Sequence, residues 1–129
     1  MNDRPINVAV LGSTGSIGQN TLAVIAESGG RLRALALSTN TNRQQIVEQA
    51  HQFTPQCIAV ADQRQAAQLD VSQLPPGTEL FSGAEGLSRL ARLDEVDVVV
   101  AAIVGSAGLL STWSALEAGK RLALANKEP

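Results

Sequence analysis

Three glycines stand at regular spacing between an apolar run and an amphipathic run near the start of the sequence. The stretch NVAVLGSTGSIGQNTLAVIAE, residues 7–27, contains Gly12, Gly15 and Gly18. Glycine loses more conformational freedom on folding than any other residue, so three at this spacing need a physical reason. A backbone without side chains can approach the pyrophosphate of a dinucleotide and offer its N–H groups to the anion.

The spacing G-x-x-G-x-x-G is a variant of the fingerprint of dinucleotide-binding turns. Gly12 would turn the chain off a strand, Gly15 would admit the phosphates, and Gly18 would let the next helix pack against the sheet. Thr14 and Ser16 could donate hydroxyl groups, and the helix N-terminus favours an anion. An ordinary glycine-rich turn is the alternative. A triphosphate-binding loop is excluded because no Lys-Ser/Thr pair follows the glycines.

The segment after the next apolar run bears on which dinucleotide would bind. An NAD enzyme usually has an acidic residue about 20 residues beyond the fingerprint, where it holds the ribose 2′-hydroxyl. Residues 37–43 read LSTNTNR and contain no acid. The cation of Arg43 could neutralise a 2′-phosphate, which favours NADP over NAD. The neutral donors of this segment are Ser38, Thr39, Asn40 and Asn42. Thr41 or Asn42 could also cap a following helix, and one residue could do both.

Apolar runs alternate with helical patterns along the chain, which predicts an α/β fold. Continuous apolar runs are typical of strands that are buried on both faces of a parallel sheet. The class we expect is a doubly wound, mainly parallel sheet with flanking helices, of Rossmann type, as one domain over residues 1–129. The predicted strands are Ile6–Leu11, Leu32–Leu37, Cys57–Ala61, Leu80–Ser82, Val96–Ala101 and Arg121–Leu124.

Helices are predicted from apolar residues that recur at helical spacing. We expect a further helix at Ala84–Leu93, a loop at Ser72–Thr78, and a helix end at Gly119. The predicted buried stripes are Ile17, Thr21, Val24 and Ile25; Ile46, Ala50 and Phe53; and Leu109, Trp113 and Leu116.

Ligands of such sheets bind beyond the carboxyl ends of the strands, so the polar segments at those ends are the candidate sites. They are Gly12–Gly18, Ser38–Asn42, Ile103–Gly108 and Asn126–Glu128. In the third segment, Gly105 and Gly108 could let the backbone approach the dinucleotide, although a plain turn would look the same. In the fourth, amide, ammonium and carboxylate groups could orient a polar ligand, and a solvated loop is the alternative.

Composition excludes several function classes. The net charge is −2 and aromatic residues make up 2% of the chain, so neither a basic footprint nor stacking platforms for nucleic acid are expected. The single cysteine, Cys57, cannot form an internal disulfide and is predicted to be buried, which is compatible with the cytoplasm. The only histidine, His51, is predicted at the surface, and we expect no metal site. No run is long enough to span a membrane.

Three motifs together carry a family resemblance. GSTGSIG, AAIVGSAGLL and LALANKE, in this order, resemble the N-terminal domain of the 1-deoxy-D-xylulose 5-phosphate reductoisomerases over essentially the whole chain. That resemblance implies an NADPH-dependent oxidoreductase of non-mevalonate isoprenoid biosynthesis, which converts its sugar phosphate to 2-C-methyl-D-erythritol 4-phosphate. It also implies Mg²⁺ or Mn²⁺ in the full-length enzyme, which is commonly a homodimer.

The resemblance also implies roles for particular residues. It places the cofactor pyrophosphate at Thr14, Gly15, Ser16 and Ile17, its adenosine and 2′-phosphate at Asn40, Thr41 and Asn42, its nicotinamide side at Asn126 and Glu128, and the substrate at Lys127. Some members have Gly-Lys-Asn where this chain has Asn40-Thr41-Asn42, which leaves Arg43 as the nearest cation. Pro129 stands where a serine is usual.

The family continues into a catalytic domain that is absent here, so we expect a fragment of about the first third that does not turn over alone. Two alternatives remain at this stage. One is the NADP-binding domain of another reductase, such as a relative of aspartate-semialdehyde dehydrogenase. The other is a non-catalytic nucleotide-binding module.

Overall fold

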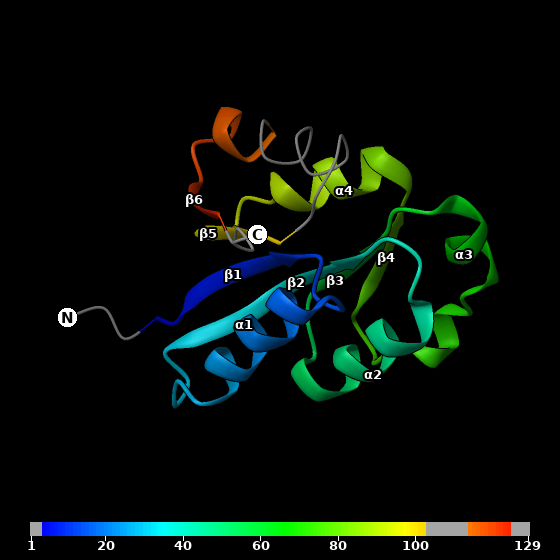
Figure 1. The fold of residues 1–129 in the computed structure, drawn as a ribbon, viewed down its shortest axis with the longest axis horizontal. Helices are drawn as coiled ribbons and strands as arrows, with labels where there is room; N and C mark the ends of the chain where they lie inside the picture. Colours follow the sequence, from blue (N-terminus) through cyan, green and yellow to red (C-terminus); the bar gives the residue numbers. More distant parts are fainter. Residues whose placement is uncertain (1–3, 103–113, 125–129) are drawn as a thin grey trace.

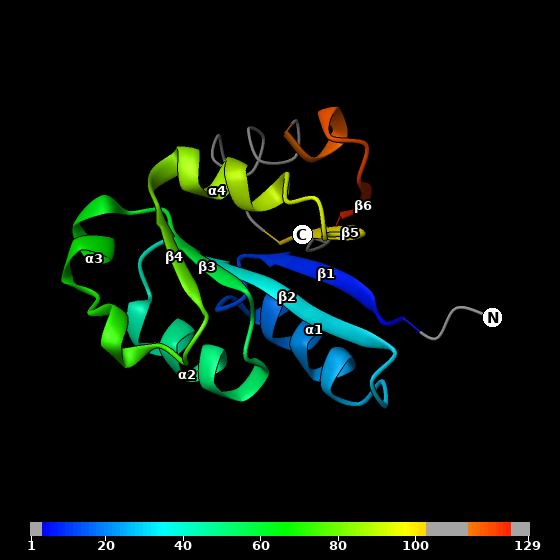
Figure 2. The same cartoon turned by 180° about the vertical axis from the view of Figure 1, so that it is seen from behind.

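The computed structural model describes residues 4–102 and 114–124, which form a sheet with helices on both faces (Figures 1 and 2). Helices α1, α2 and α3 cover one face, and α4 covers the other. In chain order the elements are β1 (Ile6–Leu11), α1 (Ser16–Ala26), β2 (Leu32–Thr39), α2 (Arg43–Phe53), β3 (Cys57–Val60), α3 (Gln63–Gln68), the 3₁₀ helix η1 (Val71–Gln73), β4 (Glu79–Ser82), α4 (Gly83–Ala91), β5 (Val98–Ala101) and β6 (Arg121–Leu124).

All neighbouring strands are parallel, in the order β4-β3-β2-β1-β5-β6. The chain steps outward from β1 to β4, and α4 then crosses the other face to place β5 beside β1. The order of strands therefore reverses at β1, and the end of β1 opens between β2 and β5. This confirms the predicted doubly wound parallel sheet, in which the reversal point is where ligands bind.

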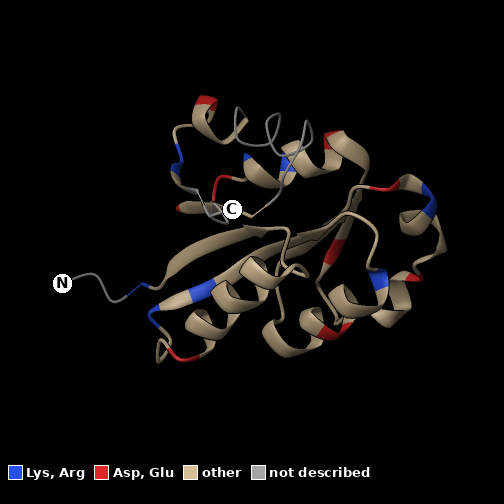
Figure 3. Ribbon diagram, in the orientation of Figure 1, with Lys and Arg blue, Asp and Glu red and all other residues tan. Residues whose placement is uncertain are grey.

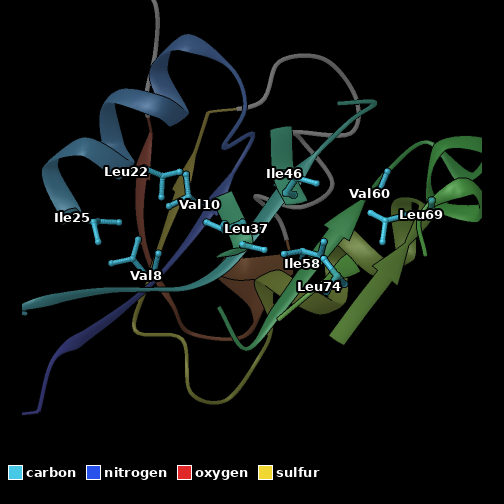
Figure 4. Packing of buried hydrophobic residues seen from close by; sticks show 13 residues of the cluster. Val8, Val10, Leu22, Ile25, Leu37, Ile46, Ile58, Val60, Leu69 and Leu74 are labelled. Atoms are coloured by element: carbon cyan, nitrogen blue, oxygen red, sulfur yellow. The ribbon is translucent and has the colours of Figure 1, made fainter. Parts of the chain in front are cut away.

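Strand β1 shows why continuous apolar runs mark this sheet. Val8 and Val10 pack into the core beneath α1 and α2, where Figure 4 shows Val10 beside Leu22 and Val8 near Ile25. Ala9 and Leu11 alternate with them and belong to the core beneath α4. Because both faces are covered, Val8 to Leu11 are apolar in succession.

The buried face of α1 differs from the predicted stripe. Gly18, Leu22 and Ile25 are buried, whereas the predicted Val24 is 61% exposed. A Cβ at Gly18 would lie 2.6 Å from the Ser13 Cα, so the helix approaches the preceding turn closely at this glycine. That contact sets the rotation of the helix and directs Leu22 inward.

The other helices agree with the sequence only in part. Ile46 and Ala50 of α2 are buried as predicted. Leu116 was expected on a buried stripe but is 52% exposed, because Ala115 faces the core instead. Helix α3 has the sequence QRQAAQ and was not predicted, since it carries no apolar stripe. Gly119, at φ +75°, lies at the predicted helix end.

Element boundaries shift by one to two residues. Strand β2 runs on to Thr39, whereas β5 begins at Val98 rather than Val96. Val96 is buried, but its N–H bonds to the Leu93 carbonyl in a turn that leads into the strand. The apolar run therefore begins two residues before the strand, and the sequence overestimated the length of β5. Within the predicted loop, η1 ends at Gln73.

Cys57 is buried in β3 as predicted, and burial raises the pKa of its thiol to about 12, with a smaller contribution from Glu79. Since the unfolded thiol titrates near 9.0, the contribution of Cys57 to stability is complete below that pH and is lost between there and about 12. By pH 10.5 the loss should reach about 2 kcal/mol. Urea unfolding of wild type and Cys57→Ala at pH 8 and pH 10.5 measures it. A difference between the two proteins that stays constant with pH would contradict the shift.

Candidate functional site

The glycine turn joins the end of β1 to the start of α1. Gly12 has φ +82°, a left-handed conformation that side chains rarely adopt, so it makes the sharp turn predicted for it. Gly15 is the N-cap of α1, and Ser16 is the exposed first residue of the helix. Ile17 is half-buried in the first turn. Gly18 packs against the turn itself rather than against a strand.

A hollow of about 300 Å³ opens at the carboxyl ends of β1, β2 and β3. We call it the carboxyl-edge hollow. Its lining includes the apolar residue Leu87 from α4, and none of its lining residues is charged. Polar and apolar lining of this kind suits a nucleoside with its phosphates. It is lined by Gly12, Thr14, Gly15, Thr39, Asn40, Thr41, Asn42, Ala61, Leu87 and Ala102.

Packing within the protein does not require a glycine at position 15, which lines this hollow. A Cβ there would meet only the Gly12 carbonyl oxygen, at 3.6 Å, which is an ordinary contact. The backbone at Gly15, φ −77° and ψ 171°, is open to any residue. The missing side chain therefore leaves space on the solvent side, where a ligand can approach the backbone.

The N-terminus of α1 carries no side-chain cap and no acidic residue in its first turn. By contrast, α2 is capped by Asn42, whose Oδ1 accepts from the Gln45 N–H at 3.1 Å, and α3 is capped by Asp62. The N-cap of α4, Ser82, makes no capping bond either. What distinguishes α1 is that its N-cap, Gly15, lines the carboxyl-edge hollow. An anion there would meet free N–H groups and the positive end of the helix dipole.

The loop between β2 and α2 forms a second wall of the hollow. Asn40, Thr41 and Asn42 all line it, as the sequence predicted, and Asn42 also caps α2. Ser38 was expected to be a donor to the ribose, and that expectation is wrong. Ser38 is fully buried within β2, and its Oγ accepts from the Gly12 N–H at 3.0 Å.

Arg43 does not line the carboxyl-edge hollow. Its Nε and Nη2 donate to the Oε1 atoms of Gln65 and Gln68 on α3, each at 2.9 Å. It borders a neighbouring depression that shares Thr41 and Asn42 with the hollow. Neutral amides orient the guanidinium without compensating its charge. Figure 3 shows the other Lys and Arg residues of the described chain spread over the molecule.

Sequence reasoning missed the side-chain hydrogen bonds that hold the turn in place. Ser13 and Gln49 form a buried pair, and Thr14 shares a hydrogen bond of 2.6 Å between hydroxyl oxygens with Thr39. Thr39 Oγ1 also accepts from the Asn42 N–H at 3.3 Å. A polar residue at a buried position of a helix, such as Gln49 beside Ile46 and Ala50, was the available signal.

A larger hollow of about 820 Å³ lies at the opposite, amino edge of the sheet. It is lined by Ile6, Val98 and Arg121, which begin β1, β5 and β6. Asp97 lies there, and its pKa is lowered by hydrogen bonds from the Arg4 side chain and from the Asn7 N–H. The glycine turn is at the other end of these strands, so this amino-edge hollow is not the predicted site.

Other candidate groups fall outside the site. His51 is exposed, as predicted, with Nε2 at 2.6 Å from the Gln73 carbonyl oxygen. Across residues 4–102 and 114–124, no cluster of three His, Cys, Asp or Glu side chains could hold a metal ion. In the same described part of the chain, no helix has the length and apolar character needed to cross a bilayer.

Several predicted residues cannot be placed, because they lie outside the described residues. The segment after β5 and the end of the chain contain them. They are Gly105, Gly108, Leu109, Trp113, Asn126, Lys127 and Glu128.

Comparison with known proteins gives one family. The model of the 1-deoxy-D-xylulose 5-phosphate reductoisomerase family matches residues 8–129. The reductoisomerase of Aliivibrio salmonicida is 48% identical over 124 residues, covering 94% of this chain and 31% of that protein. That of Nitrosococcus oceani is 47% identical over 125 residues, covering 95% and 32%. The chain thus spans about a third of the length of the curated relatives it matches.

Solved structures agree with the sequence comparison. The reductoisomerase of Zymomonas mobilis in complex with NADPH has a TM-score of 0.86 at 35% identity, covering 95% of this chain and 32% of that one. A reductoisomerase in complex with magnesium has a TM-score of 0.84 at 40% identity, covering 95% and 31%. Another, in complex with NADPH, fosmidomycin and magnesium, has a TM-score of 0.83 at 40% identity, covering 94% and 30%.

Proposed function

Because the chain belongs to the 1-deoxy-D-xylulose 5-phosphate reductoisomerase family, we propose that it is the NADPH-binding part of such an enzyme. The observation that carries this proposal is the bare backbone of Gly15 beside the carboxyl-edge hollow. Support comes from the Zymomonas mobilis structure, which contains NADPH and has the same fold. The family match favours this function over that of an aspartate-semialdehyde dehydrogenase relative.

Three groups of residues would contact three different parts of the cofactor. The pyrophosphate would lie against Thr14, Gly15, Ser16 and Ile17, where N–H groups and hydroxyls substitute for a charged side chain. The adenosine and its 2′-phosphate would lie along Asn40–Asn42, in the hollow that Leu87 also lines. Asn126 and Glu128 would contact the nicotinamide side, and Lys127 the substrate.

The activity of the whole protein is part of the same proposal. It would rearrange and reduce 1-deoxy-D-xylulose 5-phosphate to 2-C-methyl-D-erythritol 4-phosphate. When bound, NADPH supplies the hydride for the reduction. This chain's residues would orient the dinucleotide and fix its phosphates, while a divalent cation would be bound by sequence beyond them. The residues of this chain alone would not turn over, and the full-length protein would be a cytoplasmic homodimer.

Binding measurements on the full-length protein test the proposal. Calorimetric titration should give tighter binding of NADPH than of NADH, and NADPH oxidation should require both the sugar phosphate and Mg²⁺ or Mn²⁺. A nucleotide sensor would instead bind ATP or AMP as well as it binds NADPH. That result would contradict the proposed function.

Arg43→Ala tests how this chain recognises the 2′-phosphate without the lysine that some relatives carry. We expect the affinity for NADPH to fall about tenfold more than that for NADH, since a charge-assisted contact is lost only for the phosphorylated cofactor. Both affinities can be measured by calorimetry. Arg64→Ala, at an exposed position of α3, is the matched control and should change neither. Equal losses for the two cofactors would remove Arg43 from the 2′-phosphate site.

A further inference from the structure

A buried amide that does not line the carboxyl-edge hollow holds the glycine turn. Gln49 of α2 is 7% exposed, and both polar atoms of its side chain bond to Ser13. Its Nε2 donates to the Ser13 carbonyl oxygen at 2.9 Å, and its Oε1 accepts from the Ser13 Oγ at 2.7 Å. Ser13 is fully buried and stands between Gly12 and Thr14, two residues that line the hollow.

Strand β2 completes this grip on the turn. The Ser13 N–H donates to the Ser38 carbonyl oxygen at 2.8 Å, and the Gly12 N–H donates to Ser38 Oγ at 3.0 Å. The backbone polar groups of Ser13 and the N–H of Gly12 therefore all have fixed partners. A turn with a left-handed glycine has many alternative conformations, and these bonds select one of them.

Packing alone does not require a glutamine at this position. Gln49 lies on the buried face of α2 with Ile46 and Ala50, where methionine would fill a similar volume without the cost of burying an amide. The amide adds direction, because its two hydrogen bonds require the carbonyl and hydroxyl of Ser13 to lie in set positions. Its presence is explained if the conformation of the turn matters.

Helix α2 is also joined to the turn at its first end. Asn42 caps α2, its N–H donates to Thr39 Oγ1, and Thr39 Oγ1 shares a hydrogen bond with Thr14 Oγ1. The loop for the adenosine and the turn for the pyrophosphate are thus linked at both ends of one helix segment, Asn42 to Gln49. The link through Thr39 does not involve Gln49, so the adenosine loop keeps its own hydrogen bonds when the Gln49 amide is removed.

We propose that Gln49 is a positioning residue for the dinucleotide, which acts through Ser13 to hold the glycine turn in the conformation that receives the pyrophosphate. The inference rests on the proposed function. Gln49 would not touch the ligand. It would contribute to the affinity for the pyrophosphate and not to the affinity for the adenosine 2′-phosphate end.

The test compares two ligands in the full-length protein. Gln49→Met should weaken NADPH about tenfold, the value of a typical buried hydrogen-bond pair, and leave binding of adenosine 2′-phosphate, which has no pyrophosphate, within about twofold. Calorimetry measures NADPH, and competition measures the weaker ligand. Gln52→Met, at an exposed position of the same helix, is the control and should match wild type.

Each outcome decides between specific accounts. Unchanged NADPH affinity in Gln49→Met, or an equal loss for both ligands, would overturn the positioning role. If wild type itself bound no NADPH, the proposed function would fall first and this inference with it. If Gln49→Met did not fold, Ser13→Ala would carry the test, because it removes the Oγ bond but keeps the Ser13 carbonyl for Gln49. A loss confined to NADPH supports the role, and an equal loss contradicts it.

Discussion

Gly15→Val is expected to abolish NADPH binding while leaving the protein folded. The backbone of Gly15 is extended, at φ −77° and ψ 171°, and a Cβ there meets only one protein atom, at 3.6 Å. Valine is therefore compatible with the fold, but its methyl groups would occupy the space where the pyrophosphate approaches α1. We expect at least a 100-fold loss of affinity, about 3 kcal/mol, with little change in the melting temperature. Calorimetry and thermal unfolding measure the two quantities.

Gly15→Ala provides the graded control for this prediction. A single methyl group excludes less space, so its affinity should lie between those of wild type and Gly15→Val. If NADPH bound Gly15→Val as tightly as wild type, the phosphates would not lie at this turn.

Gly18→Ala is expected to damage folding, in contrast to the same change at Gly15. A Cβ at Gly18 would overlap the Gly12 carbonyl oxygen and lie 2.6 Å from the Ser13 Cα. Both are backbone atoms of residues that are held in place, since Gln49 bonds to the Ser13 carbonyl oxygen and Ser38 accepts from the Gly12 N–H. The helix must move away from the turn to accept it. Overpacking of this kind costs about 3 kcal/mol of unfolding free energy, and here the displaced atoms are backbone.

Urea unfolding of the two alanine variants measures this contrast directly. Gly15→Ala should unfold within about 0.5 kcal/mol of wild type, since it creates no close contact. A Gly18→Ala protein as stable as wild type would show that α1 does not pack on the turn at this glycine. The two glycines of one motif thus have separable roles, one in binding and one in packing.

The sequence predicted the parts of the fold that depend on local pattern. The apolar run from Val8 to Leu11 indicated a strand buried on both faces, and the structure divides its residues between two cores. Gly12 was predicted to turn the chain and has the positive φ that only glycine adopts easily. These features follow from residue type and spacing alone, so a single sequence is sufficient.

Features that depend on distant partners could not be predicted in this way. The rotation of α1 that exposes Val24 is set by the contact of Gly18 with the turn. The orientation of Arg43 depends on glutamines of a helix that has no apolar stripe. Ser38 looked like a free donor because the sequence placed the end of β2 two residues too early. In each case a tertiary contact decided the outcome.

A crystal structure of the full-length protein with NADPH tests the central claim most directly. The account predicts the pyrophosphate within about 3 Å of backbone N–H groups at the start of α1, with the adenosine in the carboxyl-edge hollow beside Asn40–Asn42. The contrary result is a nucleotide bound elsewhere, for example in the larger amino-edge hollow beside Arg121, with no phosphate at the glycine turn.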